Sequence, residues 1–307
     1  MLTVVIPAYN ESESLPFTIE EVSTIVKKLG TPFEILVIND GSSDATENVL
    51  AELQKKYFEL RAVSFSKNQG HMEALSLGMN LAKGEFVVTM DADLQDPPEL
   101  ITNMYEIISK NHDIDIVQAV RDNRDSDSFF KRQSAAAYYR ISRAITGVEV
   151  IPHAADFRMI RRTALEIING MPERRKILRF LIPHLGFHTE IVYFTRAARV
   201  SGESKYHFKA MVKLATESIV SFSAKPLRVF SILGITAAAI LLLGSLISLI
   251  IWLAYQTVPG WTSLALLVLS GNALILAGIG LLGQYVSRIY DNLLDRPHPK
   301  FTEIFRK

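Results

Sequence analysis

Apolar residues occur in short runs over the first part of the chain, and each run ends at turn-forming residues. This pattern is typical of strands buried in a parallel sheet, and it predicts strands at Leu2–Ile6, Phe33–Ile38, Leu60–Phe65, Phe86–Met90 and Ile114–Ala119. Between these runs, helical spacing and terminal capping residues predict helices at Leu15–Leu29, Ala45–Tyr57 and His71–Ala82. Alternating strands and helices predict a doubly wound α/β fold, with a ligand crevice beyond the carboxyl ends of the strands.

The C-terminal part contains two long apolar stretches. Val229–Tyr255 and Leu264–Val286 each exceed 20 residues and carry no charge, so each is long enough to cross a hydrocarbon core of about 30 Å. Lys225 and Arg228 precede the first stretch and Arg288 follows the second, whereas the connecting loop has no charge. By the positive-inside rule, both termini and the N-terminal domain are predicted to be cytoplasmic.

Two further segments, near 129–147 and 204–224, combine basic residues with aromatic or aliphatic ones. This composition suits amphipathic helices on a membrane surface, although a helix packed on the sheet would also explain the first segment. The predicted organisation is therefore a cytoplasmic α/β domain at 1–225 that includes these interfacial helices, a two-helix transmembrane hairpin at 226–287, and a cytoplasmic tail at 288–307.

The composition excludes several classes of protein. A net charge of +1 gives no argument for nucleic-acid binding. The chain has no cysteine, which excludes disulfides, thiol nucleophiles and zinc-thiolate sites. Only five apolar residues precede Pro7, so no cleaved signal peptide is expected.

An acidic turn follows the fourth predicted strand, with Asp91, Asp93 and Asp96 in MDADLQDPP at 90–98. An Asp-x-Asp at the carboxyl edge of a buried strand places two hard oxygen ligands on one side of a turn, which can hold a divalent cation against a diphosphate. An isolated Asp-x-Asp is more often an acidic loop that leads into a helix. Asp96 could instead cap a helix that begins near Pro98.

Polar residues also follow the first two predicted strands, as PAYNE at 7–11 and NDGSSD at 39–44. Because parallel strands end at the same edge of a sheet, these loops and the acidic turn are predicted to converge on one rim. The segment Ser42–Asp44 could also merely cap the next helix.

These motifs, together with NQG at 68–70, ADFR at 155–158, SGESKY at 201–206 and the two apolar stretches, resemble those of the polyprenyl-phosphate glycosyltransferases. This inverting group of glycosyltransferase family 2 includes bactoprenol glucosyltransferases and dolichyl-phosphate mannose synthases. The resemblance covers nearly the whole chain. It implies a metal-dependent nucleotide-sugar domain of the GT-A, Rossmann-like type, with Mg²⁺ or Mn²⁺ as the cofactor.

The resemblance also implies roles on the donor side. Asp93 is the expected metal ligand, with Asp91 near the ribose or the metal and Gln95 near the metal or the phosphates. Asp40 is the candidate for the nucleobase, and because a carboxylate accepts N–H groups from uracil or guanine, it does not choose between UDP and GDP. The residues that resemble the family's nucleotide-cradling turn are Pro7, Tyr9 and Glu11.

The acceptor side needs cations more than a base. A lipid monophosphate has its second pKa near 6 and is largely an anion at pH 7, so no residue must deprotonate it, whereas its approach to an anionic donor requires neutralisation. The cations chosen for this role are Arg121, Arg132 and Lys205. Asp156 resembles the family's acidic residue at the acceptor side; it could act as a base, orient a sugar hydroxyl or pair with Arg158.

The expected function is transfer of one sugar, with inversion at C1, from a nucleotide sugar to a polyprenyl phosphate at the cytoplasmic face of a bacterial inner membrane. UDP-glucose is the first choice of donor, and GDP-mannose is the alternative. A processive polysaccharide synthase fits less well, because Trp252 and Trp261 do not stand in a Gln-x-x-Arg-Trp motif. A nucleotide-binding subunit of a lipid-linked sugar transporter is the non-enzymatic alternative, against which the charge-free stretches argue. Glycines within Leu264–Val286 favour a homo-oligomer.

Overall fold

The computed structural model describes residues 1–122, 147–171, 176–195, 260–293 and 300–304, together with isolated positions between 143 and 243. The chain divides into two compact units. One unit comprises 1–140, 148–206 and 296–307, and the other comprises 141–147 and 207–295.

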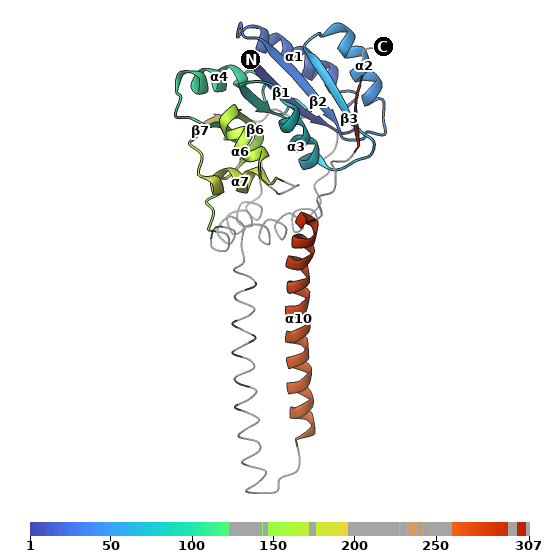
Figure 1. Ribbon diagram of the computed structural model, residues 1–307, viewed down its shortest axis with the longest axis vertical. Helices are drawn as coiled ribbons and strands as arrows, with labels where there is room; N and C mark the ends of the chain where they lie inside the picture. The colour runs from blue at the N-terminus through green and yellow to red at the C-terminus, as the bar shows by residue number, and fades with distance from the viewer. Residues whose placement is uncertain are drawn as a thin grey trace. The chain divides into compact units, whose positions relative to one another are not determined.

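The first unit is built on a single sheet with the strand order β7-β5-β6-β4-β1-β2-β3-β8 (Figure 1). Its strands are β1 (Leu2–Ala8), β2 (Phe33–Asn39), β3 (Leu60–Phe65), β4 (Phe86–Thr89), β5 (Ile116–Arg121), β6 (Ala154–Arg161), β7 (Thr189–Phe194) and β8 (Phe301–Glu303). The sheet is mixed but mostly parallel, because β6 and β8 are antiparallel to their neighbours. The five predicted strands are confirmed, whereas β6, β7 and β8 were not predicted.

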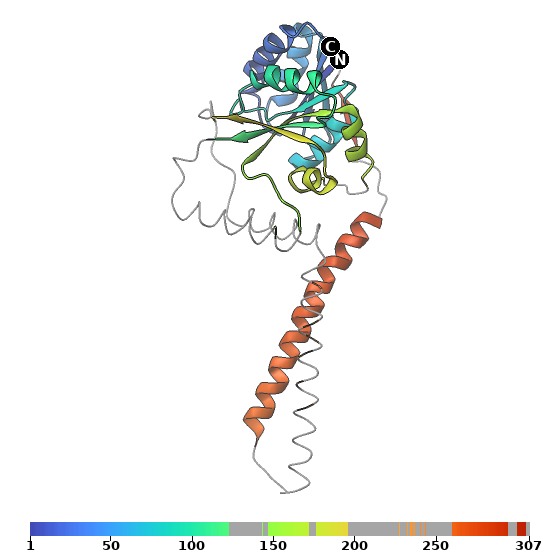
Figure 2. The same ribbon diagram turned by 90° about the vertical axis from the view of Figure 1, so that its left-hand side faces the viewer.

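Helices cover both faces of this sheet. They are α1 (Leu15–Lys27), α2 (Thr46–Lys56), α3 (His71–Leu81), α4 (Leu100–Lys110), α6 (Arg162–Asn169) and α7 (Leu178–Leu185). On one face α1 contacts α2 and α4, and on the other α3 contacts α6 (Figures 1 and 2). The three predicted helices are confirmed to within a few residues. The N-cap position of α4 belongs to Glu99, so the hypothesis that Asp96 caps this helix is wrong.

The core lies between β1 and the helices that flank it. All seven residues of β1 are buried, because the strand has neighbours on both edges and helices on both faces. One stripe of α1 packs against it through Leu15, Ile19 and Val22, and burial of each such side chain stabilises the fold by about 1.5–3 kcal/mol. On the other face α3 approaches so closely that a Cβ on Gly78 would lie 2.3 Å from Val5 Cγ1. This packing fixes the strand ends that carry the polar loops.

The second unit contains α10 (Trp261–Leu293), which includes the predicted membrane span Leu264–Val286. Nearly all of the other predicted span, Val229–Tyr255, and of the predicted interfacial helices lies outside the described residues. Within the described part of the chain, no helix combines the length and the apolar character needed to cross a membrane. The transmembrane hairpin therefore stays a prediction.

Candidate active site

The loops that follow β1 and β2 are joined by hydrogen bonds. The Asn10 N–H donates to Ser42 Oγ at 2.9 Å, and Asn10 Oδ1 accepts the Ser43 N–H at 2.9 Å. Asn10 adopts the left-handed conformation, with φ of 56°, which asparagine tolerates better than most residues. The Glu11 N–H donates to Thr46 Oγ1 at 3.0 Å. The two loops therefore form one braced rim at the carboxyl edge of the sheet.

The predicted nucleotide-cradling residues lie at three different depths in this rim. Pro7 is buried in β1, paired with Ile38 of β2. Tyr9 is 38% exposed at the rim. The Glu11 carboxylate accepts the Ser14 hydroxyl at 2.7 Å, so it supports the start of α1 as well as the loop.

Asp44 both precedes α2 and braces the neighbouring loop. Its Oδ1 accepts the Thr46 N–H at 3.0 Å, and its Oδ2 accepts the Ser12 N–H at 3.3 Å. Burial opposes ionisation of Asp44, but the hydrogen bonds from Thr46 and Ser12 outweigh it and hold the pKa of this carboxyl at about 2. The segment Ser42–Asp44 therefore does more than begin a helix.

Asp44 should make stability depend on pH. Its folded pKa of about 2 lies below its ordinary value, so its contribution is complete above pH about 4 and is lost as the pH falls towards the folded pKa. We expect the difference in unfolding free energy between the wild type and Asp44→Asn to shrink between pH 5 and pH 3, measured by urea unfolding. Asp113→Asn, at an exposed position, is the control, and an equal shrinkage in both variants would contradict the assignment.

Asp40 is held by the loop that follows β3. Its side chain is buried, and its two oxygens accept the Gln69 N–H at 2.7 Å and the Gly70 N–H at 2.9 Å. Burial raises the pKa of Asp40, although these two hydrogen bonds oppose the rise. Because each oxygen already accepts one backbone N–H, a nucleobase would have to use a remaining lone pair. The NQG motif is thus the structural partner of Asp40.

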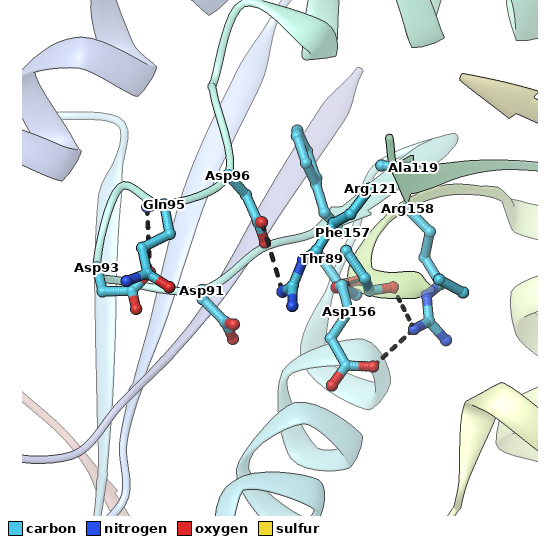
Figure 3. Close-up of polar contacts among 12 residues, drawn as sticks. Thr89, Asp91, Asp93, Gln95, Asp96, Ala119, Arg121, Asp156, Phe157 and Arg158 are labelled. Atoms are coloured by element: carbon cyan, nitrogen blue, oxygen red, sulfur yellow. Dashed lines mark hydrogen bonds and ion pairs between the residues drawn. The ribbon is translucent and has the colours of Figure 1, made fainter. Parts of the chain in front are cut away.

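The acidic turn after β4, whose side chains Figure 3 shows, is held by one hydrogen bond from α1 and by one within the turn. The Thr18 hydroxyl of α1 donates to the Ala92 carbonyl at 2.8 Å, and the Gln95 N–H donates to Asp93 Oδ1 at 3.2 Å. Leu94 takes the left-handed conformation, with φ of 55°. The turn presents Asp91 and Asp93, which are both partly exposed, at the rim.

The side chains of this turn fit a divalent cation that is shared with a ligand. Burial and the nearby carboxylates of Asp156 and Asp93 raise the pKa of Asp91, while His71 and Arg121 lower it; a cation would relieve this crowding of negative charge. Gln95 Oε1 is buried and has no hydrogen-bond partner among the described residues.

Among all the residues that the structure describes, no three His, Asp or Glu side chains are grouped so that they could hold a metal by themselves. The predicted set of Asp91, Asp93 and Gln95 would therefore need phosphate oxygens and water to complete a coordination shell, as Mg²⁺ commonly does.

Arg121 ends β5 beside the acidic turn. Its Nη2 lies 3.8 Å from Oδ1 of Asp96, which is 1% exposed. Its Nε is buried and has no hydrogen-bond partner within the described ranges. The structure thus brings one of the three predicted acceptor-side cations to the rim. The other two, Arg132 and Lys205, lie outside the described residues.

Asp156, on β6, forms an ion pair with Arg158 (Figure 3) and also lies near a histidine. Its Oδ1 accepts from Nη2 of the fully buried Arg158 at 2.7 Å, and its Oδ2 lies 3.7 Å from His71 Nε2. The same His71 nitrogen lies 3.9 Å from Asp91 Oδ1. Burial opposes ionisation of Asp156, but His71, Arg158 and Arg179 outweigh it and hold its pKa well below the usual range. Asp156 is therefore a weak proton acceptor at neutral pH.

His71 is the rim residue that sequence reasoning missed. Removal from bulk water lowers the pKa of His71, but Asp156, Asp91 and Asp40 together raise it above its ordinary value. The sequence does contain a clue to its position, because His71 directly follows NQG and opens α3 at the carboxyl edge of β3. Its placement links Asp91 to Asp156.

Comparison with known proteins shows that the chain is a glycosyltransferase. Residues 3–168 match the family model described as glycosyl transferase family 2, and the chain belongs to this family. It is 34% identical over 297 residues to an SfII prophage-derived bactoprenol glucosyl transferase of Shigella flexneri, with 96% of each chain covered. It is also 35% identical over 296 residues to an uncharacterized glycosyltransferase of Bacillus subtilis, with 96% of this chain and 91% of that protein covered. The resemblance drawn from the motifs is thereby confirmed.

Solved structures support the fold. Glucosyl-3-phosphoglycerate synthase of Mycobacterium tuberculosis, in complex with Mn²⁺, UDP-glucose and phosphoglyceric acid, superposes with a TM-score of 0.54 at 17% identity, covering 72% of this chain and 77% of that one. The same enzyme with Mg²⁺ and UDP gives a TM-score of 0.52 at 20% identity, covering 72% and 77%. At these identities the likeness establishes an α/β, GT-A-like fold.

Proposed function

We propose that this glycosyltransferase moves one sugar from a nucleotide sugar, with UDP-glucose as the first choice, to a polyprenyl phosphate. The observation that carries the proposal is the rim itself, where the Asp40 loop and the acidic turn lie at the ends of β2 and β4, the parallel strands on either side of β1, and Asp156 adjoins Asp91 through His71. The relatives named as bactoprenol glucosyl transferases support both the sugar and the lipid acceptor.

Acidic side chains and a metal ion would hold the nucleotide-sugar donor. Asp91 and Asp93, with Gln95 Oε1, are the groups proposed to hold Mg²⁺ or Mn²⁺ against the diphosphate. When bound, such an ion neutralises the charge that develops on the departing nucleotide. The M. tuberculosis synthase, which binds Mn²⁺ or Mg²⁺ with UDP, supports this choice of cofactor. Asp40 would bind the nucleobase, and Tyr9 would lie beside the nucleobase on the rim.

The acceptor phosphate would attack as an anion. A bond forms between a phosphate oxygen and C1 while the bond from C1 to the nucleotide breaks, so a single displacement inverts C1 and no proton has to move. Asp156 is paired with Arg158, and its own pKa is depressed. A carboxylate with a depressed pKa is a poor base, so we favour a role for Asp156 in orienting the substrate. Arg121 would neutralise the incoming phosphate, together with Arg132 and Lys205.

We further propose that the protein is anchored at the cytoplasmic face of a bacterial inner membrane, as a homo-oligomer. Apolar side chains of α10 support this, since Leu267, Ile275, Ile279, Leu282 and Val286 are each at least 50% exposed. Exposed apolar side chains that gather on one element are typical of a surface that contacts lipid or a partner protein.

A transfer assay tests the proposal. Detergent-solubilised full-length protein is given UDP- and GDP-sugars with polyprenyl phosphate, with and without Mg²⁺ or Mn²⁺. We expect metal-dependent transfer from UDP-glucose to give a β-linked lipid product. Preference for GDP-mannose would contradict the choice of donor alone. Nucleotide binding without transfer or hydrolysis of any donor would contradict the proposed enzymatic activity. It would favour a nucleotide-binding subunit of a transporter.

A further inference from the structure

The chain returns to the sheet after α10 and adds β8 to the outer edge of β3 (Figure 1). The pairing is antiparallel, with Thr302 opposite Ser64 at its centre. Backbone hydrogen bonds extend the ladder at both ends, from the Ser66 N–H to the Lys300 carbonyl at 3.2 Å and from the Ile304 N–H to the Ala62 carbonyl at 2.9 Å. The sequence of the predicted cytoplasmic tail gives no indication of this strand.

Side chains reinforce the pairing. Arg61 of β3 contacts Glu303 Oε1 through Nε at 3.0 Å and Nη2 at 2.5 Å. Ile304 is partly buried against the hydrophobic core. The same Arg61 also reaches the Leu81 carbonyl at the end of α3, at 3.5 Å. The C-terminal strand is thus tied to the elements on either side of the loop that follows β3.

That loop is the one that holds Asp40. Ser66, which donates to Lys300, immediately precedes the loop Lys67–Gly70, and the last two amides of this loop bind the two Asp40 oxygens. The loop also packs closely against the turn that contains Gly41, since a Cβ on Gly41 would lie only 2.3 Å from the Lys67 carbonyl carbon. The position of Asp40 therefore depends on where β3 directs this loop.

A second contact links β3 to the residue that precedes Asp40. The Ser64 hydroxyl accepts from Asn39 Nδ2 at 3.0 Å, and Asn39 directly precedes Asp40. Ser64 is also the residue opposite Thr302 in the β3–β8 ladder. Without β8, the outer edge of β3 would lose its backbone partners, and an unpaired edge is a site of local opening.

We propose that β8 is a positioning element for the nucleoside diphosphate: its pairing with β3 holds Lys67–Gly70 on Asp40 and thereby sets the affinity of the donor site. The identity of the ligand rests on the proposed function, whereas the effect on the loop does not. Glu303 and Thr302 act through β3 and touch no reacting atom. The release of β8 would weaken nucleotide binding more than it slows the transfer step.

The test compares Thr302→Pro, which removes an N–H from the centre of the ladder, with Thr302→Val, which keeps it. Two measurements are made on the full-length protein: amide hydrogen exchange without nucleotide, and UDP binding with Mg²⁺. In Thr302→Pro we expect faster exchange at Gln69 and Gly70 and UDP binding weaker by about tenfold, since a small displacement of a positioning group has effects of this order or larger. The donor KM should rise more than kcat falls, and Thr302→Val should match the wild type.

Unchanged exchange at Gln69 and Gly70 in a folded Thr302→Pro protein would overturn the proposal, as would UDP affinity within twofold of the wild type. If Thr302→Pro fails to fold, Arg61→Glu and Glu303→Arg replace it: each single variant should accelerate exchange at Gln69 and Gly70, and the double variant should restore protection. Absence of that pattern would also overturn the proposal. A wild type that binds neither UDP nor GDP would instead contradict the proposed function, and the exchange result would still decide the role of β8.

Discussion

Replacement of Asp93 by Asn is expected to lower kcat/KM for sugar transfer by about 10²–10³-fold, the range seen when one electrostatic group is removed from a transition-state site. Asn keeps the size of the side chain and an oxygen that can still accept the Gln95 N–H, which in the wild type lies 3.2 Å from Asp93 Oδ1. The turn should therefore keep its shape while its charge falls. Initial rates measured over a range of Mn²⁺ concentrations would show the loss together with a higher metal requirement.

Glu99→Gln is the matched control for this variant. It also removes one negative charge, but Glu99 is exposed at the start of α4 and lies in a hollow lined by α1 residues and by none of the rim residues. We expect it to retain full activity. Full activity of Asp93→Asn, or transfer that proceeds equally well without a divalent cation, would contradict the proposed metal-binding turn.

Replacement of Gly41 by Ala is expected to lower the free energy of unfolding by about 3 kcal/mol, as the sum of a left-handed backbone conformation and a steric overlap. Gly41 has φ of 63°, and its new Cβ would lie 2.3 Å from the Lys67 carbonyl carbon and 2.5 Å from the Asn68 nitrogen. Both contacts are with backbone, so neither can be relieved by turning a side chain. Urea unfolding in detergent, followed by circular dichroism, measures the change.

Gly30→Ala separates the two contributions. Gly30 has nearly the same φ, 64°, but no described atom lies within 4 Å of the position of its Cβ. It should therefore lose only about 1 kcal/mol, from the backbone conformation alone. If Gly41→Ala is no less stable than Gly30→Ala, the close packing of Gly41 against the loop Lys67–Gly70 is contradicted.

The first five strands could be predicted because strands that are buried on both faces read as continuous apolar runs. β6 could not, because charged residues interrupt it: Asp156 and Arg158 pair with each other, and Arg161 donates to carbonyls of residues 108, 111 and 114. β7 is an edge strand with mostly half-exposed side chains, and β8 is only three exposed residues long. β8 carries no apolar pattern that distinguishes it from a loop, whereas β7 contains the strand-forming run Ile191–Phe194, which the prediction overlooked.

The residue types of the site could be predicted better than their partners. Asp40, Asp91 and Asp93 follow strands, and the sheet topology alone places them along one edge. The groups that fix Asp40 are backbone amides, which any sequence supplies, so the pattern of side chains does not reveal them. His71 was missed for a related reason: a single histidine at the start of a helix has no distinctive spacing, and only the fold brings it near Asp91 and Asp156.

The place of β8 after α10 in the sequence also bears on how the protein is made. A ribosome completes β1 to β4 early in synthesis, but it releases residues 300–304 only after the sequence of α10 has been translated. The edge of β3 therefore stays without this partner until residues 300–304 have left the ribosome. A premature stop or proteolytic trimming just beyond α10 would remove no residue of the rim, yet it would leave β3 without its partner.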